Sequence, residues 1–266
     1  MPVVKAGNIH MYYEVHGQGE PLLLIMSMGN DLSGWQGQIP QLSTKYRVLA
    51  FDNRGSGRTE APDAPYTIAM MADDTAALME ALGMAKANVL GKSMGGYIAE
   101  ELAIRHPGRV ASLMLAATSI GPYIAEAPIL ESWVREKAQG MNKKTLFQLM
   151  LPFIFTDKTF EEPENVRMAV ETIASRPQAT PAYAMRRQFI ACAEHSARGR
   201  TGDVDAPTLV LAGSEDLFIP FSLSAELAAV FPNGRLVVLK GGGHELNVDV
   251  PEKFNKAVLD FLAEVA

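Results

Sequence analysis

The chain has 266 residues, a formal net charge of −6, and 48% hydrophobic against 20% charged residues. At about 150 residues per domain, this length corresponds to roughly 1.8 domains, and a chain of this size buries about 70–75% of its unfolded surface. The composition excludes a largely disordered chain. The mild acidity disfavours nucleic acid as a partner, because proteins that bind nucleic acid usually carry a basic patch.

Cysteine and histidine usage limits the cofactors that we expect. Cys192 is the only cysteine, which excludes an intramolecular disulfide and cysteine-rich zinc sites and leaves this residue an expected packing role. The five histidines lack zinc-site spacing, and no glycine-rich phosphate-binding motif occurs. We therefore expect no metal and no organic cofactor.

The chain shows no sign of targeting to a membrane. No basic segment followed by an apolar one opens the sequence, as a signal peptide would require. The uncharged run over residues 110–125 is shorter than the ~20 residues of a membrane helix. We expect a cytoplasmic protein, a monomer or small homo-oligomer, that binds a small molecule rather than a membrane or nucleic acid.

The predicted elements begin as strands and then alternate. Apolar runs and alternation predict strands over 9–15, 22–26 and 46–51. There follow a helix over 67–82, a strand over 87–90, a helix over 97–105 and a strand over 110–117. After residue 203 come strands over 208–212 and 235–239 and helices over 221–230 and 251–265. This order predicts an α/β fold with a mostly parallel sheet, helices on both faces and an antiparallel edge.

The region between residues 119 and 203 breaks this alternation. It has helical patterns near 130–138, 144–150, 165–174 and 181–195, with prolines between them and no strand pattern. Such a length is too great for a connecting loop. We expect a helical cap over 120–202, inserted into a core made of 1–119 and 203–266, above the sheet edge where such folds bind ligands.

A glycine-rich turn carries the clearest chemical signal. Gly91-Lys92-Ser93-Met94-Gly95 lies between a predicted strand and a predicted helix. In that context the motif is typical of a nucleophile elbow, which holds a serine above the sheet and needs small neighbours. The alternative is an ordinary glycine-rich loop.

A serine nucleophile needs a base, and His244 is the best candidate. It follows the strand over 235–239 through three glycines, at the carboxyl edge of the sheet. The alternative is a solvated loop histidine. His195, in the cap, is expected to be structural.

A base histidine needs a carboxylate to orient it. Glu215 and Asp216 both follow the strand over 208–212, and we favour Asp216. The order Ser93, Asp216, His244 is the order along the chain expected for a nucleophile-elbow fold.

An acyl-transfer site also needs two backbone N–H donors for the developing oxyanion. We assign one to Met94, which follows the serine, and one to Met28, in the loop after the strand over 22–26. Backbone donors leave no side-chain signature, so this assignment rests on position.

Together these segments resemble the α/β-hydrolase superfamily over nearly the whole chain. The matching pieces are residues 22–25 with their loop, 52–59, the elbow at Ser93, the turn over 213–220 and Gly243-His244. The resemblance implies a mostly parallel eight-stranded sheet, a helical cap and a serine hydrolase. Residues 28–35 look most like β-ketoadipate enol-lactonases and related esterases and C–C hydrolases.

The chain departs from that pattern at two places. Many relatives carry His-Gly where this chain has Met26-Ser27, which alters the support of the oxyanion loop. The residue before the nucleophile is commonly His, Gln or Asn, and here it is Lys92. Its charge either lies near Ser93 and His244 or reaches water with the stem packed.

Candidate pocket residues are Gly29, Lys92, Trp133 and Phe218, and the methionines near the motifs suggest an apolar pocket. Asp52 and Arg54 are expected to form a structural ion pair or turn. Three cap arginines are candidates for binding a substrate carboxylate, although solvated faces are favoured: Arg135, Arg186 and Arg187.

The leading hypothesis is hydrolysis of an ester or lactone through an acyl-enzyme on Ser93. The alternatives are C–C bond hydrolysis of vinylogous diketones and a cofactor-free perhydrolase or haloperoxidase-like activity, both with the same residues. A ligand receptor on the same fold is the alternative from another class.

Overall fold

The computed structural model describes residues 2–122, 127–161, 164, 166–167, 170–171 and 180–266. Its strands are β1 (Val3–Ala6), β2 (Ile9–His16), β3 (Glu20–Ile25), β4 (Tyr46–Phe51), β5 (Ala87–Lys92), β6 (Val110–Ala116), β7 (Thr208–Gly213) and β8 (Gly234–Leu239). The helices are α1 (Ile39–Leu42), α2 (Ile68–Ala81), α3 (Met94–Arg105), α4 (Ala127–Ala138), α5 (Lys143–Ile154), α6 (Asp157–Glu161), α8 (Ala182–Glu194), α9 (Phe221–Val230), α10 (Leu246–Asp249) and α11 (Pro251–Val265). Two short 3-10 helices are η1 (Leu32–Trp35) and η2 (Pro107–Arg109).

One eight-stranded sheet forms the centre, in the order β1-β2-β4-β3-β5-β6-β7-β8. The pairs β1–β2 and β2–β4 are antiparallel, and every later pair is parallel. This arrangement confirms the predicted fold class, including the antiparallel edge. Strands β5 and β7 are buried along their whole length, and β3 is buried from Leu22 onward, because both faces of the sheet are covered.

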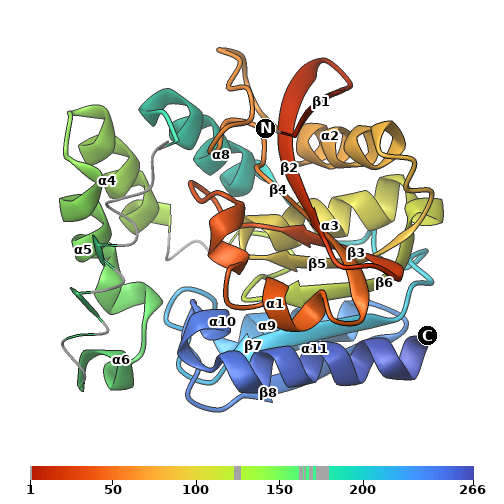
Figure 1. Cartoon of the computed structure of the whole chain (residues 1–266). Helices are drawn as coiled ribbons and strands as arrows, with labels where there is room; N and C mark the ends of the chain where they lie inside the picture. Colours follow the sequence, from red (N-terminus) through yellow and green to blue (C-terminus); the bar gives the residue numbers. More distant parts are fainter. Residues whose placement is uncertain (1, 123–126, 162–163, 165, 168–169, 172–179) are drawn as a thin grey trace.

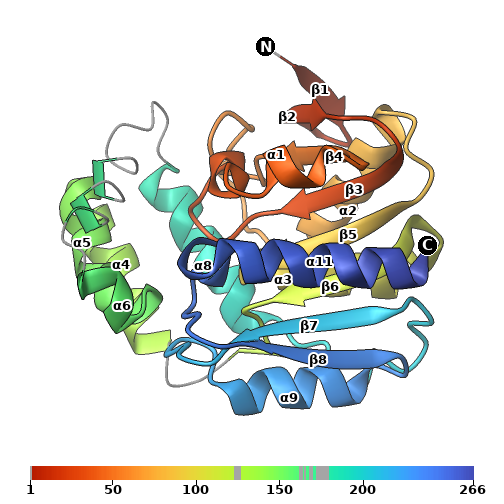
Figure 2. The same cartoon turned by 60° about the horizontal axis from the view of Figure 1, so that its bottom comes forward.

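Helices cover the sheet on both faces (Figures 1 and 2). Helices α2, α3 and α9 bury one apolar cluster against it, which includes Leu78, Ile98 and Leu227. Helices α1 and α11 bury a second cluster on the opposite face, which includes Leu42 and Phe254. The strands β5, β6 and β7 therefore lie between two layers, and their carboxyl ends meet at one edge.

Helices α4, α5, α6 and α8 lie between β6 and β7 in sequence and gather at that edge (Figure 1). A third apolar cluster joins α4 and α5 to the loop after β7 through Trp133, Phe155 and Phe218. The helix expected over 165–174 falls largely outside the described residues. The exact cap boundaries, 120 and 202, remain a prediction.

Several short elements were not expected from the sequence. Strand β1 and the helices α1, α6 and α10 are only four or five residues long. Helix α3 begins at Met94 and not at the predicted Tyr97. The prediction began the helix after the Gly95-Gly96 pair, whereas in the structure both glycines lie inside its first turn. Among the described residues, no helix has both the length and the apolar character needed to cross a membrane.

Candidate active site

The strand-to-helix turn between β5 and α3 presents Ser93 at the carboxyl edge of the sheet. Ser93 adopts φ 55° and ψ −121°, a conformation that a non-glycine residue rarely takes. Its N–H donates to the Ala116 carbonyl at 2.9 Å, and its own carbonyl accepts the Gly96 N–H at 2.7 Å. These bonds hold the turn and project the Ser93 side chain away from the sheet.

Two glycines allow this turn to pack closely. A Cβ on Gly91 would lie 2.1 Å from the Gly95 carbonyl oxygen, and a Cβ on Gly95 would lie 2.1 Å from the Ile25 carbonyl oxygen. Both distances are far below van der Waals contact with rigid backbone. The glycines of the motif are therefore explained by the approach of β5, α3 and the loop after β3.

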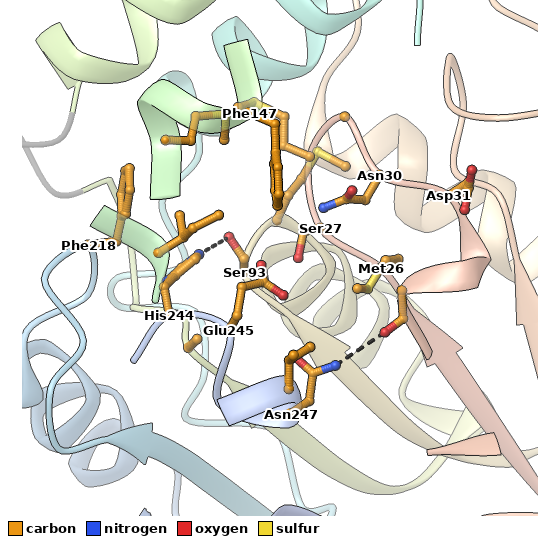
Figure 3. A pocket seen from close by; sticks show the side chains of 18 of the residues that line it. Met26, Ser27, Asn30, Asp31, Ser93, Phe147, Phe218, His244, Glu245 and Asn247 are labelled. Carbon is orange, nitrogen blue, oxygen red and sulfur yellow. Dashed lines mark hydrogen bonds between the residues drawn. The ribbon is translucent and has the colours of Figure 1, made fainter. Parts of the chain in front are cut away.

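His244 lies between Ser93 and Asp216, as Figure 3 shows for its contact with the serine. Its Nε2 lies 3.1 Å from Ser93 Oγ, and its Nδ1 lies 3.1 Å from Asp216 Oδ2. The other Asp216 oxygen accepts the N–H groups of Phe218 and Ile219 at 2.8 and 2.9 Å. The carboxylate is thus fixed on one oxygen and free to orient the imidazole with the other.

Burial and charge act in opposite directions on His244. Burial disfavours its charged form, but the charge of Asp216 and its hydrogen bond outweigh this, so the pKa of His244 is raised above its ordinary value. The Phe218 ring packs beside the imidazole at 5.1 Å between centroids. The site therefore contains a shielded nitrogen base within hydrogen-bond distance of a hydroxyl.

The loop after β3 lies across from Ser93. Its turn is closed by the Asn30 N–H, which donates to the Ser27 carbonyl, and by Asn53 Nδ2, which donates to the Met26 carbonyl at 2.7 Å. Gly29 has φ 70°, and its N–H donates to Gln188 Oε1 at 2.9 Å. Within the described parts of the chain, the Met28 N–H has no such acceptor.

The Asp52 carboxylate stabilises this loop by hydrogen bonds. It accepts the N–H groups of Leu32 and Arg58, each at 2.8 Å, and burial raises its pKa to about 6. Of the two expected structures, the ion pair between Asp52 and Arg54 is wrong, whereas the turn is present and is closed by the Ser56 N–H, which donates to the Asn53 carbonyl at 2.8 Å. Arg54 instead binds Asp74 through two bonds of 2.6 Å, both side chains being buried, which joins the loop after β4 to α2.

A cavity of about 480 Å³ lies above Ser93, between the sheet edge and the cap. Ser93, Met28, Met94 and His244 reach it, and Figure 3 shows the cap's Phe147 and the loop's Phe218 at its wall. The apolar part of its lining includes methionines from four different segments, Met26, Met94, Met150 and Met185 among them. This lining suits an apolar ligand of moderate size.

Of the four predicted pocket residues, two line the cavity and two do not. Gly29 and Phe218 line the cavity. Trp133 lies behind its wall, where its ring packs on Phe153 and Phe218. Lys92 does not line it either: the side chain is fully buried, and its Nζ lies 2.5 Å from Glu245 Oε2, so the amine does not reach water.

The expectations for the cap residues have mixed outcomes. His195 is buried against the Tyr97 ring, and burial lowers its pKa to about 4, in keeping with a structural role. Arg187 pairs with the exposed Asp63, and Arg186 is exposed. Cys192 packs against the core as expected, and it also borders the cavity.

Sequence reasoning missed three polar residues of the site, namely Gln188, Glu245 and Asn247. Glu245 and Asn247 line the cavity, and Gln188 binds the loop after β3 through the Gly29 N–H. The position of Glu245 directly after His244 is the only sequence signal that pointed to any of them. Gln188 and Asn247 make contacts with residues far along the chain, which no local pattern reveals.

The fold and this site define the class of protein. A sequence profile described as "alpha/beta hydrolase fold" matches residues 20–172, and one described as "TAP-like protein" matches residues 185–265. The chain therefore belongs to the α/β-hydrolase family and is a hydrolase of that fold.

Individual relatives cover almost the whole chain. "Putative carbamate hydrolase RutD" of Azorhizobium caulinodans is 30% identical over 100% of this chain and 99% of its own. "Putative non-heme bromoperoxidase BpoC" of Mycobacterium tuberculosis is 32% identical over 97% and 99%. The enol-lactonase of Burkholderia xenovorans has a solved structure with a TM-score of 0.87 and 31% identity over 98% of this chain and 100% of that one.

Proposed function

We propose that this protein is a serine hydrolase that cleaves a carboxylic ester or a lactone through an acyl-enzyme on Ser93. One observation carries the proposal: Asp216, His244 and Ser93 form a continuous line of contacts, each 3.1 Å long, that ends at the cavity. A hydroxyl beside an oriented imidazole is the arrangement that nucleophilic acyl transfer needs.

Acylation begins when Ser93 Oγ attacks the substrate carbonyl carbon and His244 Nε2 takes the hydroxyl proton. The carbonyl oxygen gains the electron pair and is held by the N–H groups of Met28 and Met94. When the tetrahedral intermediate collapses, the C–O bond breaks and the leaving alkoxide takes the proton from His244. Asp216 stabilises the imidazolium between these two transfers.

Deacylation repeats these steps with water as the nucleophile. His244 removes a proton from the water, the hydroxyl adds to the acyl carbon, and Ser93 Oγ leaves with the proton returned. The products are a carboxylic acid and an alcohol, or a single hydroxy acid when the substrate is a lactone. No other reactant is required.

The cavity and the names of the relatives both indicate which substrates to test. The volume and the apolar wall of the cavity favour a substrate with an acyl or alkyl group of moderate size over a polymer. The relatives' names include a carbamate hydrolase and an enol-lactonase. Carbamate esters and lactones both present an electrophilic carbonyl that the same attack would open.

The same residues would also serve C–C bond hydrolysis or perhydrolysis, so the test compares substrates. Purified protein is assayed with short and long acyl esters, lactones, carbamate esters and vinylogous diketones, and for peroxide-dependent bromination. We expect turnover of an ester or lactone and a loss of about 10⁴-fold or more in kcat for Ser93→Ala. Faster turnover of a diketone or of peroxide would favour those alternatives.

Covalent labelling distinguishes a serine hydrolase from a ligand receptor on the same fold. A fluorophosphonate should label wild-type protein at neutral pH, leave Ser93→Ala unlabelled, and give one adduct by mass spectrometry. Circular dichroism of the variant checks that its fold is retained. Unlabelled wild-type protein, or labelling that survives in Ser93→Ala, would contradict the assignment of the nucleophile.

A further inference from the structure

Lys92 is a completely buried lysine next to the proposed nucleophile. Its side chain has no exposed surface, and its Nζ lies 2.5 Å from Glu245 Oε2. In the part of the chain that the structure describes, the ammonium has no polar partner other than this carboxylate. Burial of an ammonium is costly without a partner, so each charge of this pair depends on the other.

The pair joins the two segments that carry the proposed chemistry. Lys92 ends β5 and directly precedes Ser93, whereas Glu245 directly follows His244. The Lys92–Glu245 contact therefore joins the same two segments as the Ser93–His244 contact, one residue away on each. Figure 3 shows Glu245 beside Ser93 and His244 at the cavity.

The two charges also act on His244 in opposite directions. Lys92 disfavours the imidazolium, whereas Glu245 and Asp216 favour it. The nearby carboxylate of Asp249, in α10, is bound to different groups. It accepts the Gly243 N–H at 2.8 Å and the Thr159 hydroxyl at 3.0 Å. The charges that act most on His244 are thus those of Asp216, Lys92 and Glu245.

We propose that Lys92 and Glu245 are a positioning pair for the proposed hydrolysis: the ion pair holds the Ser93 turn against the His244 loop and balances the charge near the imidazole. This inference rests on the proposed function and adds two residues to it. Neither residue touches the reacting atoms in this account. The pair acts through the distance between Ser93 and His244 and through the protonation of His244.

The charge balance is tested by NMR titration of His244 in the Ser93→Ala background, where turnover plays no part. Lys92→Met should shift the His244 titration upward by about one pH unit, because the Glu245 charge is then uncompensated. Glu245→Gln should shift it downward, because the ammonium is then uncompensated. The double variant should return close to the parent value. His244→Asn assigns the resonance.

Positioning is tested by kinetics with Ser93 intact. Each single variant should lower kcat about tenfold and leave KM within twofold, and the acid limb of kcat/KM should move with the NMR titration. The exposed residues Lys86 and Glu252 provide matched controls, Lys86→Met and Glu252→Gln, which should change neither quantity. The double variant should recover the acid limb but not kcat, because the contact between the segments is still missing.

Two outcomes would overturn the pair's role. One is an unchanged His244 titration in both single variants, and the other is wild-type kcat in both. If a single variant fails to fold, the double variant, which leaves no unpaired charge, still reports kcat. Failure of the proposed function is a different result: wild-type protein would turn over no ester or lactone, although the opposite NMR shifts persist.

Discussion

Asp216 is the residue that sets the basicity of His244. It favours the imidazolium by its charge and by its 3.1 Å contact, and this outweighs the effect of burial. The base in the proposed mechanism is the neutral imidazole. Activity should therefore fall as the pH decreases through the raised pKa of His244, which places the acid limb of kcat/KM above the ordinary value of 6.5.

Replacing Asp216 by asparagine should change both the rate and its pH dependence. The neutral amide no longer stabilises the imidazolium, so the acid limb should move to lower pH than in wild-type protein. The loss of the oriented tautomer should lower kcat by about 10³-fold or more. Both effects are measured as kcat/KM between pH 5 and 9 with the best substrate of the panel.

Glu215 is the matched control for this prediction, because it is the neighbouring carboxylate and is exposed. Glu215→Gln should retain the wild-type profile within about twofold. The sequence places both carboxylates after β7, and we favour Asp216 over Glu215. If the acid limb of kcat/KM moves in Glu215→Gln and stays in place in Asp216→Asn, then Asp216 is not the carboxylate that orients His244.

At the scale of elements, the β5–α3 turn was predictable and its surroundings were not. Gly91, Ser93 and Gly95 form a local motif whose spacing reflects a steric need inside the turn. Lys92 lies in the same motif, but its partner Glu245 lies far along the chain, so its burial could not be read from the sequence. The four-residue elements β1, α1 and α10 are too short to show a period.

The close approach at Gly95 gives a prediction about stability. Gly95→Ala would place a Cβ 2.1 Å from the Ile25 carbonyl oxygen, and only backbone movement would relieve that clash. We expect a loss of about 2 kcal/mol or more in the free energy of unfolding, which corresponds to a decrease in Tm of roughly 5 °C or more. Thermal unfolding followed by circular dichroism measures it.

Gly108→Ala is the control for Gly95→Ala. Gly108 is exposed, and a Cβ there would meet nothing within 4 Å. Its Tm should stay the same or rise slightly, since alanine restricts the unfolded chain. Equal Tm values for both variants would show that the turn is looser than the contacts at Gly95 imply.

At the scale of the whole molecule, the cap and the core meet through apolar packing and through a few buried polar contacts. Gln188, on α8, is fully buried, and its amide donates to the Arg54 carbonyl at 2.8 Å and to Ser56 Oγ at 3.0 Å. Its oxygen accepts the Gly29 N–H at 2.9 Å. The sequence indicated a cap by its length and helical pattern, but contacts between distant segments decide which cap residues reach the site.

Gln188→Leu should weaken the oxyanion loop without touching the proposed triad. The partly buried Gly29 N–H and the buried Arg54 carbonyl would both lose these bonds, so the loop that carries Met28 should be held less firmly. We expect kcat to fall about 10- to 100-fold, with KM changed less and with fluorophosphonate labelling of Ser93 retained but slower. The exposed cap residue Gln139 provides the same substitution as a control, and Gln139→Leu should leave kcat unchanged. Wild-type kcat in Gln188→Leu would mean that the Gln188 bond is not needed to position this loop, whose Gly29 carbonyl also accepts the Thr180 hydroxyl at 3.1 Å.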